Sequence, residues 1–570
     1  MKELLETIAE YRKRAKRLAI FSVLVIVQFC QLTYAEWQIS QFGITWSFNR
    51  DYTVGQFANG DYWVLGPVTI IGIDPPSTQT NGRTINGSMV NPSPELGTKQ
   101  GYDSAMYGKY GRGLNFVPNL NVGRPNNRDL SARNYFVLQP YSSLVSTISV
   151  PEEGHRPQLR TAAILTVLSE PAPEGSFRPP YCGIDKSIKF NKDQLDYSLL
   201  ANLKPVPDAP DIMTVERYFE RPWIDHVPRW MGRYHHPTEN MPDYGRDIAT
   251  RIGIGAIKLN LDLTKQMKEV LLIRYVQLGI DLYGIVQDGG KNNWVNDGGH
   301  AGGRKWPILF AGLVLNNTDM INIGRTDIAN YNPSHQEYVH FGEDDQTFYV
   351  SDKDIYEPPY EKHVWSGEFV YYGHGKGDKR RDYLEYTQEH RGMPEWGIVH
   401  TTYPNQDGLD WNASYRRAGT ANAWGGFVLA AHIMGVKELW NHDALFDYMD
   451  RYMEVEKEFA GVGHWIRQWS GFIENMWDAY RSDYVPVWTM SPVLNIIATG
   501  GSVTKSPHKT VYALGRKVIL SAVADDGYEF AGWSGGLSGM ENPATIIMHV
   551  NRTIVANFAV RNNTSADSSK

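Results

Sequence analysis

The chain has 570 residues, of which 42% are hydrophobic and 21% charged, and this composition is that of a globular protein with several domains. The net charge of -7 gives no electrostatic support for a nucleic-acid partner. The 17 Trp and 33 Tyr residues supply aromatic surface that can fill cores or stack on the apolar faces of sugar rings.

The N-terminus has the pattern of an export signal. Basic residues cluster at positions 12–17, residues 18–30 are apolar, and Thr33-Tyr34-Ala35 is a suitable cleavage site. We therefore predict a signal peptide over residues 1–35 and a protein that is secreted, periplasmic or on the cell surface. An uncleaved N-terminal anchor is the alternative. Cleavage would leave Cys182 as the one cysteine, so the mature chain could form no internal disulfide.

Residues 36–205 have the pattern of a β-rich domain. Short apolar runs at 62–65, 68–73 and 162–168 lie between clusters of Gly, Pro and Asn, and no long stretch has helical spacing. We predict a β-sandwich-like fold for this region.

Residues 206–490 change to helical spacing. Apolar residues recur at helical intervals in five segments, at 248–263, 265–286, 308–315, 421–434 and 444–459. Long polar loops separate them, and loops of this length inside a compact domain are usually functional. The pattern predicts helical hairpins arranged as an all-α (α/α) toroid, with a helical bundle as the alternative.

Four polar segments of this region are dense in residues that bind ligands. Residues 293–306 place Trp, His, Arg and Lys among glycines and lead directly into an apolar helix, and residues 400–417 repeat this design. Residues 229–237 and 341–349 are the other two, and we expect the acidic run 343–345 to be a solvated loop or a helix N-cap. In a toroid such loops can converge on one cleft. The alternative is a structural loop whose His and Arg bind backbone carbonyls.

The C-terminal residues 491–559 return to short strands. The sequence Gly500-Gly501-Ser502-Val503, the motif Gly-Tyr-x-Phe-x-Gly-Trp at 527–533 and the closing strand 553–558 resemble the divergent InlB-type B-repeat family of bacterial surface and secreted proteins. The resemblance implies a small β-rich accessory module without catalysis, and a possible association with the cell surface. Residues 560–570 have the composition of a disordered tail.

An exported β-rich domain, a helical toroid and an accessory module together resemble the polysaccharide lyases of the (α/α)-toroid type, alginate lyases among them. The resemblance implies β-elimination on a uronic-acid-containing polysaccharide such as alginate or a glucuronan. Such a reaction needs a base, an acid for the leaving oxygen, and groups that neutralise the uronate carboxylate.

We assign these roles within the two densest loops. His300 is the base or carboxylate neutraliser, Arg304 and Asn412 bind the carboxylate, and Tyr403 or Tyr415 is the acid. Neighbouring sugars are expected on six residues: Trp294, Trp306, Tyr234, His235, Arg416 and Trp411.

Two other functions stay open at this stage. An inverting glycoside hydrolase would need two carboxylates about 6.5–9.5 Å apart, with Asp297, Glu343, Asp407 and Asp410 as candidates. A non-catalytic surface protein that binds carbohydrate would need only the accessory module and an aromatic surface. A metal between His235, His236 and His300 has weak support, so we expect no metal and no cofactor.

Overall fold

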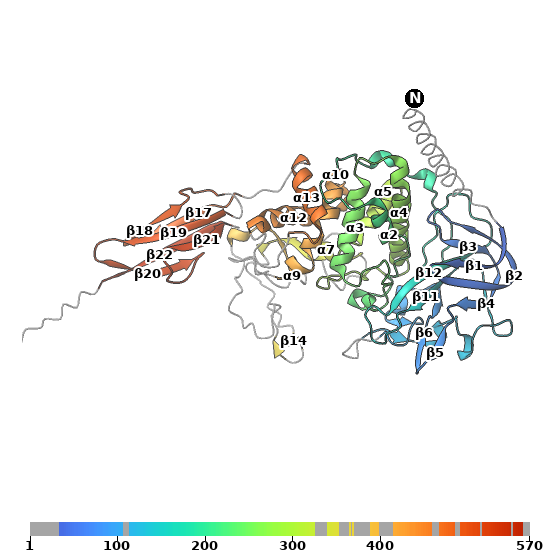
Figure 1. The fold of residues 1–570 in the computed structure, drawn as a ribbon. Coiled ribbons are helices and arrows are strands. Elements are labelled where there is room, and N and C mark those ends of the chain that lie inside the picture. The colour runs from blue at the N-terminus through green and yellow to red at the C-terminus, as the bar shows by residue number, and fades with distance from the viewer. Residues whose placement is uncertain are drawn as a thin grey trace, which may run out of the picture.

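The computed structural model describes residues 34–106, 113–324, 339–352, 364–365, 368–369, 388–397, 414–458, 467–484, 491–512, 516–548 and 551–561. A β-rich N-terminal region, a central helical region and a β-rich C-terminal region follow one another along the chain (Figure 1). The protein is therefore multidomain. The predicted signal peptide lies outside the described residues, except that the first strand begins at Tyr34.

One eight-stranded sheet dominates the N-terminal region. Its strands follow the order β10-β4-β2-β3-β12-β11-β7, and β1 pairs with β2. The bounds are β1 Tyr34–Gln41, β2 Ile44–Gln56, β3 Tyr62–Leu65, β4 Val68–Asp74, β7 Ser88–Val90, β10 Phe136–Leu138, β11 Ser142–Ser149 and β12 Leu159–Leu168. The predicted β-rich character is confirmed, and the pairing gives one main sheet where two packed sheets were expected.

Strand β12 is covered on both faces, because alternate side chains enter two different cores. Ala163, Leu165 and Val167 pack with the other strands of the sheet. Ala162 and Ile164 belong to the core of the helical region. The second of these cores extends from the N-terminal sheet into the helices, and it fixes the sheet against the helices that carry the candidate site.

Each of the five predicted helical segments contains a helix, and further helices, at 212–218 and 471–480 among them, were not predicted. The bounds of these helices are α2 Ile212–Tyr218, α3 Gly245–Leu259, α4 Lys265–Gln287, α5 Lys305–Val314, α10 Gly425–Ile433, α12 Asp443–Val455 and α13 Gly471–Tyr480. Helix α4 packs on α5, and α3 packs on α10. The second contact is close because it is built on glycine: a Cβ at Gly253 would lie 2.9 Å from the Cα of Gly426. In the described ranges, no helix is both long and apolar enough to span a bilayer.

The C-terminal region has two three-stranded sheets around its own core. The sheet orders are β17-β22-β20 and β18-β19-β21. The bounds are β17 Leu494–Ala498, β18 Gly501–Ser506, β19 Arg516–Ala524, β20 Tyr528–Gly535, β21 Ala544–Met548 and β22 Arg552–Val560. Trp533 of the Gly-Trp motif is buried in this core and donates its indole N–H to the carbonyl of Glu541 at 2.7 Å. The motif therefore has a structural role.

Candidate functional site

Three of the four dense polar segments meet in space. The amide of Arg229 donates to the carbonyl of Asn293 at 2.7 Å, and the amide of Trp230 donates to Asp297 Oδ2 at 3.1 Å. From the third segment, Gln346 Nε2 donates to the carbonyl of Gly298 at 2.8 Å. These three segments therefore contact one another, and the cleft expected between them stays a prediction. Of the fourth segment, residues 400–413 lie outside the described residues.

One side of the 293–306 loop is anchored in the protein interior by Asp225. The Asp225 carboxylate accepts hydrogen bonds from Trp294 Nε1 at 3.0 Å and from Arg304 Nε at 2.9 Å, and it contacts His236 Nε2 at 3.2 Å. Burial opposes ionisation of Asp225, but the charges and hydrogen bonds of Arg304 and His236 together outweigh it and lower the pKa of Asp225.

This anchoring corrects the role expected for Arg304. Its side chain is 3% exposed, and Nη1 donates to the carbonyls of His300 and Gly302, each at 3.0 Å. Because its donors are already used inside the protein, Arg304 holds the loop and has no free face for a uronate carboxylate.

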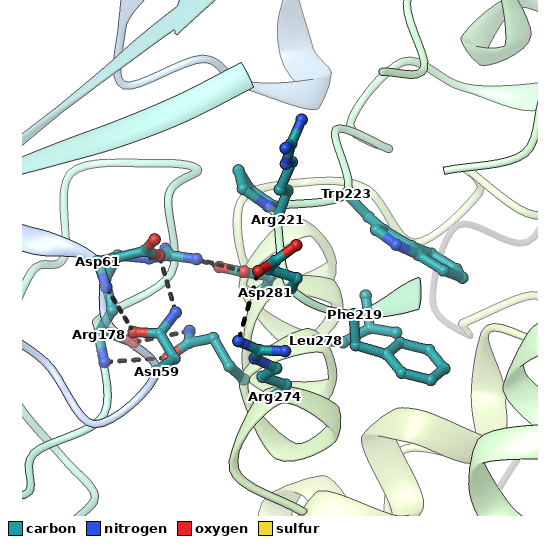
Figure 2. Close-up of a pocket in the computed structure, with 12 residues that line it drawn as sticks. Asn59, Asp61, Arg178, Phe219, Arg221, Trp223, Arg274, Leu278 and Asp281 are labelled. Carbon is teal, nitrogen blue, oxygen red and sulfur yellow. Dashed lines mark hydrogen bonds and ion pairs between the residues drawn. The ribbon is translucent and has the colours of Figure 1, made fainter. Parts of the chain in front are cut away.

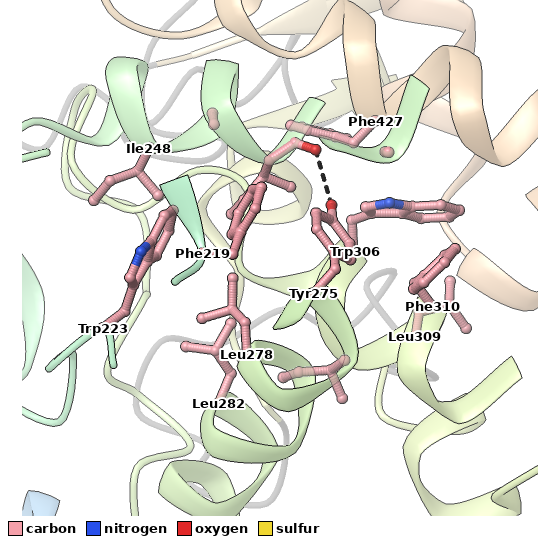
Figure 3. Close-up of a cluster of buried hydrophobic side chains, with 14 of the residues drawn as sticks. Phe219, Trp223, Ile248, Tyr275, Leu278, Leu282, Trp306, Leu309, Phe310 and Phe427 are labelled. Carbon is pink, nitrogen blue, oxygen red and sulfur yellow. Dashed lines mark hydrogen bonds between the residues drawn. The ribbon is translucent and has the colours of Figure 1, made fainter. Parts of the chain in front are cut away.

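The two tryptophans of the loop are also interior residues. Trp306 is 0% exposed and stacks on Trp440 with ring centroids 6.2 Å apart, within the apolar cluster of Figure 3. Trp294 is 2% exposed and stacks on Phe341 at 6.0 Å. Neither ring can contact a sugar here, so the expected sugar-binding role is corrected to core packing.

Three further residues expected at a sugar face the interior. His235 is fully buried, 4.9 Å from the ring of His226, and burial lowers its pKa well below the usual value. Tyr234 is 7% exposed. Arg416 is fully buried and lies 3.3 Å from Glu395 Oε1. We therefore assign all three to packing.

His300, unlike Arg304 and the two tryptophans, is partly exposed. Its ring packs edge-on against Tyr244 with centroids 4.9 Å apart and an interplanar angle of 87°. Burial, helped by Arg233 and Arg304, lowers the pKa of His300 to about 3. Neither ring nitrogen bonds another residue in the described part of the chain. The imidazole is therefore neutral near pH 7 and cannot neutralise a carboxylate by charge.

Two arginines lie near the same tyrosine, and one of them also contacts an exposed indole. The guanidinium carbons of Arg233 and Arg246 lie 5.7 and 5.5 Å from the Tyr244 ring centroid. Arg246 also lies 3.5 Å from the ring centroid of Trp469, which is 45% exposed. We call His300, Tyr244, Arg233, Arg246 and Trp469 the Tyr244 cluster.

Glycine makes the Tyr244 cluster possible. A Cβ at Gly299 would collide with the Tyr244 hydroxyl and would lie 2.7 Å from the carbonyl oxygen of Gly419. A Cβ at Gly419 would lie 2.7 Å from the same hydroxyl. The tyrosine therefore fits between two backbone segments that are 120 positions apart in the sequence, and only a residue without a side chain leaves it room.

The charges around the Tyr244 cluster favour an anionic ligand. Arg233 pairs with Asp243 at 3.0 Å, Arg156 lies 3.5 Å from the same carboxylate, and Arg246 pairs with Asp247 at 3.1 Å. Three guanidinium groups and two carboxylates leave one positive charge in excess. All of these side chains are at least partly exposed, so the charge is open to solvent and to a ligand.

The carboxylates considered for a hydrolase do not form an open pair in the described part of the chain. Asp297 accepts the amide of Trp230, and Glu343 is fully buried and accepts the amide of Gly303 at 2.9 Å. Glu343, Asp344 and Asp345 were expected in a solvated loop or at a helix N-cap; they lie in the first turn of the short helix α7 (Gly342–Asp345), and all three are buried. Asp407 and Asp410 lie outside the described residues.

A pocket at the junction of the sheet and the helices is a second place where charged groups gather (Figure 2). At its floor Arg178 donates to Asp61 Oδ2 at 2.6 Å and to Asp281 Oδ2 at 2.5 Å. Arg274 at its rim lies 3.7 Å from Glu220. The floor arginine and its two carboxylates join the β2–β3 turn to helix α4. We assign this pocket a structural role, because its charged groups satisfy one another.

Sequence reasoning missed Tyr244, Arg246 and Trp469. The first two directly precede the predicted helix at 248, and Trp469 precedes the cap of α13 at Ser470. Their position just before apolar helices is the same signal that drew attention to residues 293–306. Tyr403, Trp411 and Asn412 lie outside the described residues. Tyr415 belongs to α9 (Ser414–Ala418), but its side chain is also outside them.

Comparison with known protein families identifies the C-terminal module. Residues 493–562 match the divergent InlB B-repeat domain, as the motifs at 500–503 and 527–533 predicted. No curated protein and no solved structure matches the chain significantly. In the part of the chain that the structure describes, no group of three or more His, Cys, Asp or Glu side chains is arranged to hold a metal ion.

Proposed function

We propose that the protein is a polysaccharide lyase that cleaves a uronic-acid-containing chain, of alginate or glucuronan type, by β-elimination. The observation that carries the proposal is the Tyr244 cluster. It combines a neutral imidazole, two arginines and an exposed indole where three loops meet. These are the residue types that bind an acidic sugar and move a proton next to its carboxylate.

His300 is the proposed base. The reaction removes the proton on the carbon next to the uronate carboxylate, and the electron pair then forms a double bond as the 4-linked oxygen leaves. His300 is unprotonated at the start of the reaction, as a base must be, and the negative carboxylate of a bound uronate would raise its low pKa toward the working range. Tyr403 or Tyr415 remains the proposed acid for the leaving oxygen, and Asn412 the proposed amide on the carboxylate.

Arg233 and Arg246 take the role first given to Arg304. Both are partly exposed, whereas Arg304 is enclosed with Asp225. A guanidinium can neutralise the carboxylate by two parallel hydrogen bonds as negative charge develops. Trp469, which is exposed on the surface beside Arg246, would stack on a neighbouring sugar.

The wider architecture belongs to the same proposal. The α3–α10 and α4–α5 contacts are those that neighbouring hairpins of an (α/α) toroid would make. A signal peptide and a B-repeat module suit an enzyme that acts outside the cell, on a polymer too large to enter it.

The direct test is a screen of the full chain against alginate, glucuronan, pectin and glycosaminoglycans. We expect new absorbance near 230 nm (roughly the unsaturated-uronate chromophore) on at least one polymer. We expect His300→Ala to lower kcat/KM at least about 100-fold and Arg246→Ala to raise KM about tenfold. His508→Ala, an exposed histidine of the C-terminal module, is the matched control.

The other outcomes decide between functions. New reducing ends without the new absorbance would show that the protein is a hydrolase and not a lyase. Binding of a polymer without turnover would favour a carbohydrate-binding protein. Full activity in His300→Ala would show that His300 is not the base, even if the protein is a lyase.

A further inference from the structure

Four consecutive side chains hold the loop that carries His300. They belong to the short helix α7 (Gly342–Asp345) and the residue that follows it, and each bonds a different point of the loop. Asp345 Oδ2 accepts the amide of Asn296 at 3.2 Å, Gln346 Nε2 donates to the carbonyl of Gly298 at 2.8 Å, Glu343 Oε2 accepts the amide of Gly303 at 2.9 Å, and Asp344 pairs with Lys305.

These contacts lie on both sides of His300 in the sequence. Two of the bonded positions, 296 and 298, precede it, and two, 303 and 305, follow it. The backbone at His300 can therefore move little unless one of the four bonds breaks. Gly342 tightens the contact further, since a Cβ there would lie 2.7 Å from the Cβ of Ala301.

The segment 343–346 is itself fixed to the neighbouring helices. Asp344 Oδ1 accepts the indole N–H of Trp440 at 2.7 Å, and Lys305 Nζ donates to the carbonyl of Trp440 at the same distance. Thr347 lies 2.8 Å from His442 Nε2, on the turn before α12. Through the segment 343–346, the loop is thus tied to the packed helices of the central region.

Glu343 differs from Asp344, which pairs with Lys305, because within the described residues no cation is bonded to its carboxylate. Its side chain is fully buried, Oε2 accepts from Gly303, and Oε1 has no hydrogen-bond partner in the described part of the chain. A buried carboxylate without a bonded cation is costly, whereas a carboxylic acid or an amide can accept the same hydrogen bond without charge.

We propose that the segment 343–346 is the positioning element of the His300 loop, and that Glu343 performs this role in its uncharged form. The effect on catalysis rests on the proposed function, but the hold on the loop does not. None of the four side chains touches the reacting atoms, so they are positioning residues.

The pH at which the charge would matter follows from the surroundings of Glu343. The titratable groups around it are Asp344 and Asp345 on α7, Lys305 on α5, and His340 and His442 nearby. Burial, with Asp344 next, raises the pKa of Glu343 to about 7. We call the loop closed when its bonds to 343–346 are formed and open when they are broken. Because the pKa of Glu343 is raised only in the closed loop, the closed loop retains a proton that the open loop releases as the pH rises. Glu343 therefore stabilises the closed loop below about pH 4.5, and this stabilisation is lost as the pH rises to 7.

Hydrogen–deuterium exchange of the full chain, followed by mass spectrometry of peptides covering 296–304, tests the proposal without any substrate. After correction for intrinsic exchange, we expect wild-type protection to fall about tenfold per pH unit between 4.5 and 7 and to level off above 7. We expect no such fall in Glu343→Gln, which keeps an acceptor for Gly303, and low protection at every pH in Glu343→Ala. Glu438→Gln, an exposed residue of α11 (Lys437–Trp440), controls for loss of one negative charge.

Flat wild-type protection over this pH range, or the wild-type slope in Glu343→Gln, would overturn the proposal. A second readout is kcat on whichever uronate polymer the wild type cleaves. Glu343→Ala should lose at least about tenfold and Glu343→Gln should restore it. If no polymer is cleaved, the proposed function fails, while the exchange measurement still decides whether 343–346 positions the loop.

Discussion

The anchored side of the 293–306 loop and the Tyr244 cluster use the same residue types for different purposes. Arg304 on the anchored side is enclosed with Asp225, and Trp306 lies in the apolar core. In the Tyr244 cluster, Arg246 lies on the face of the exposed Trp469, close to partly exposed His300. Residue type alone does not separate a structural arginine from one that can bind ligand. The two kinds of arginine are distinguished by the group that each one contacts and by its exposure to solvent.

The comparison also explains why both sides are needed. A partly exposed histidine on a glycine-rich loop would be mobile by itself, and a precise site requires that its support be rigid. Asp225 holds the loop from one direction, and residues 343–346 hold it from another. The three experiments that follow probe this division, from the largest expected effect to the smallest.

Replacing Arg304 with Met should have the largest effect. It leaves the Asp225 carboxylate buried without its main cation, and we expect the free energy of unfolding to fall by about 3–5 kcal/mol. Urea unfolding measures this. Arg217→Met, at an exposed position of α2, is the control. A loss below about 1 kcal/mol would mean that Arg304 does not anchor the loop.

Gly299→Ala should have an intermediate effect. The new methyl group meets the Tyr244 hydroxyl and the Gly419 carbonyl, so we expect a cost of about 1–3 kcal/mol and a displaced His300–Tyr244 contact. Unfolding and polymer cleavage should decline together. Gly471→Ala is the matched control, because a Cβ there has nothing within 4 Å. Unchanged stability and activity would show that Tyr244 does not need the close approach.

Trp469→Ala should have the smallest effect on stability. The indole is 45% exposed and its recorded ring contact is with Arg246, so we expect a change of less than about 1 kcal/mol. The KM for a uronate polymer should nevertheless rise. Trp37→Ala, another exposed tryptophan at 52%, should change neither quantity. A large loss of stability in Trp469→Ala would show that this residue has a structural role like that of Arg304.

Local pattern was sufficient to predict five of the helices and the β-rich character of both ends of the chain, but it did not predict α2 or α13. The apolar spacing at 265–286 became α4, and the apolar run at 162–168 became part of β12. The Gly-Tyr-x-Phe-x-Gly-Trp motif identified the B-repeat because its spacing directly encodes a strand and a buried Trp. These signals depend on residues close in sequence, and such signals survive without knowledge of the tertiary contacts.

The roles of the polar residues could not be predicted in the same way. Arg304 became structural because of Asp225, which is 79 positions away, and Glu343 became buried because of the loop 40 positions away. Likewise, Tyr244 gained its place from two glycines in distant segments. A sequence shows which side chains can form hydrogen bonds and ion pairs, but only the fold decides which of them are used internally.

One paired measurement tests the division between the two sides most directly, because it makes the same conservative change on each. Arg304→Lys and Arg246→Lys both keep the charge and lose the planar guanidinium. For each, the free energy of unfolding and kcat/KM on a uronate polymer are measured together. We expect Arg304→Lys to lose stability more than activity, because it loosens the support of His300 without touching substrate, and Arg246→Lys to keep stability while losing activity. The reverse pattern, or equal effects in both variants, would contradict the account.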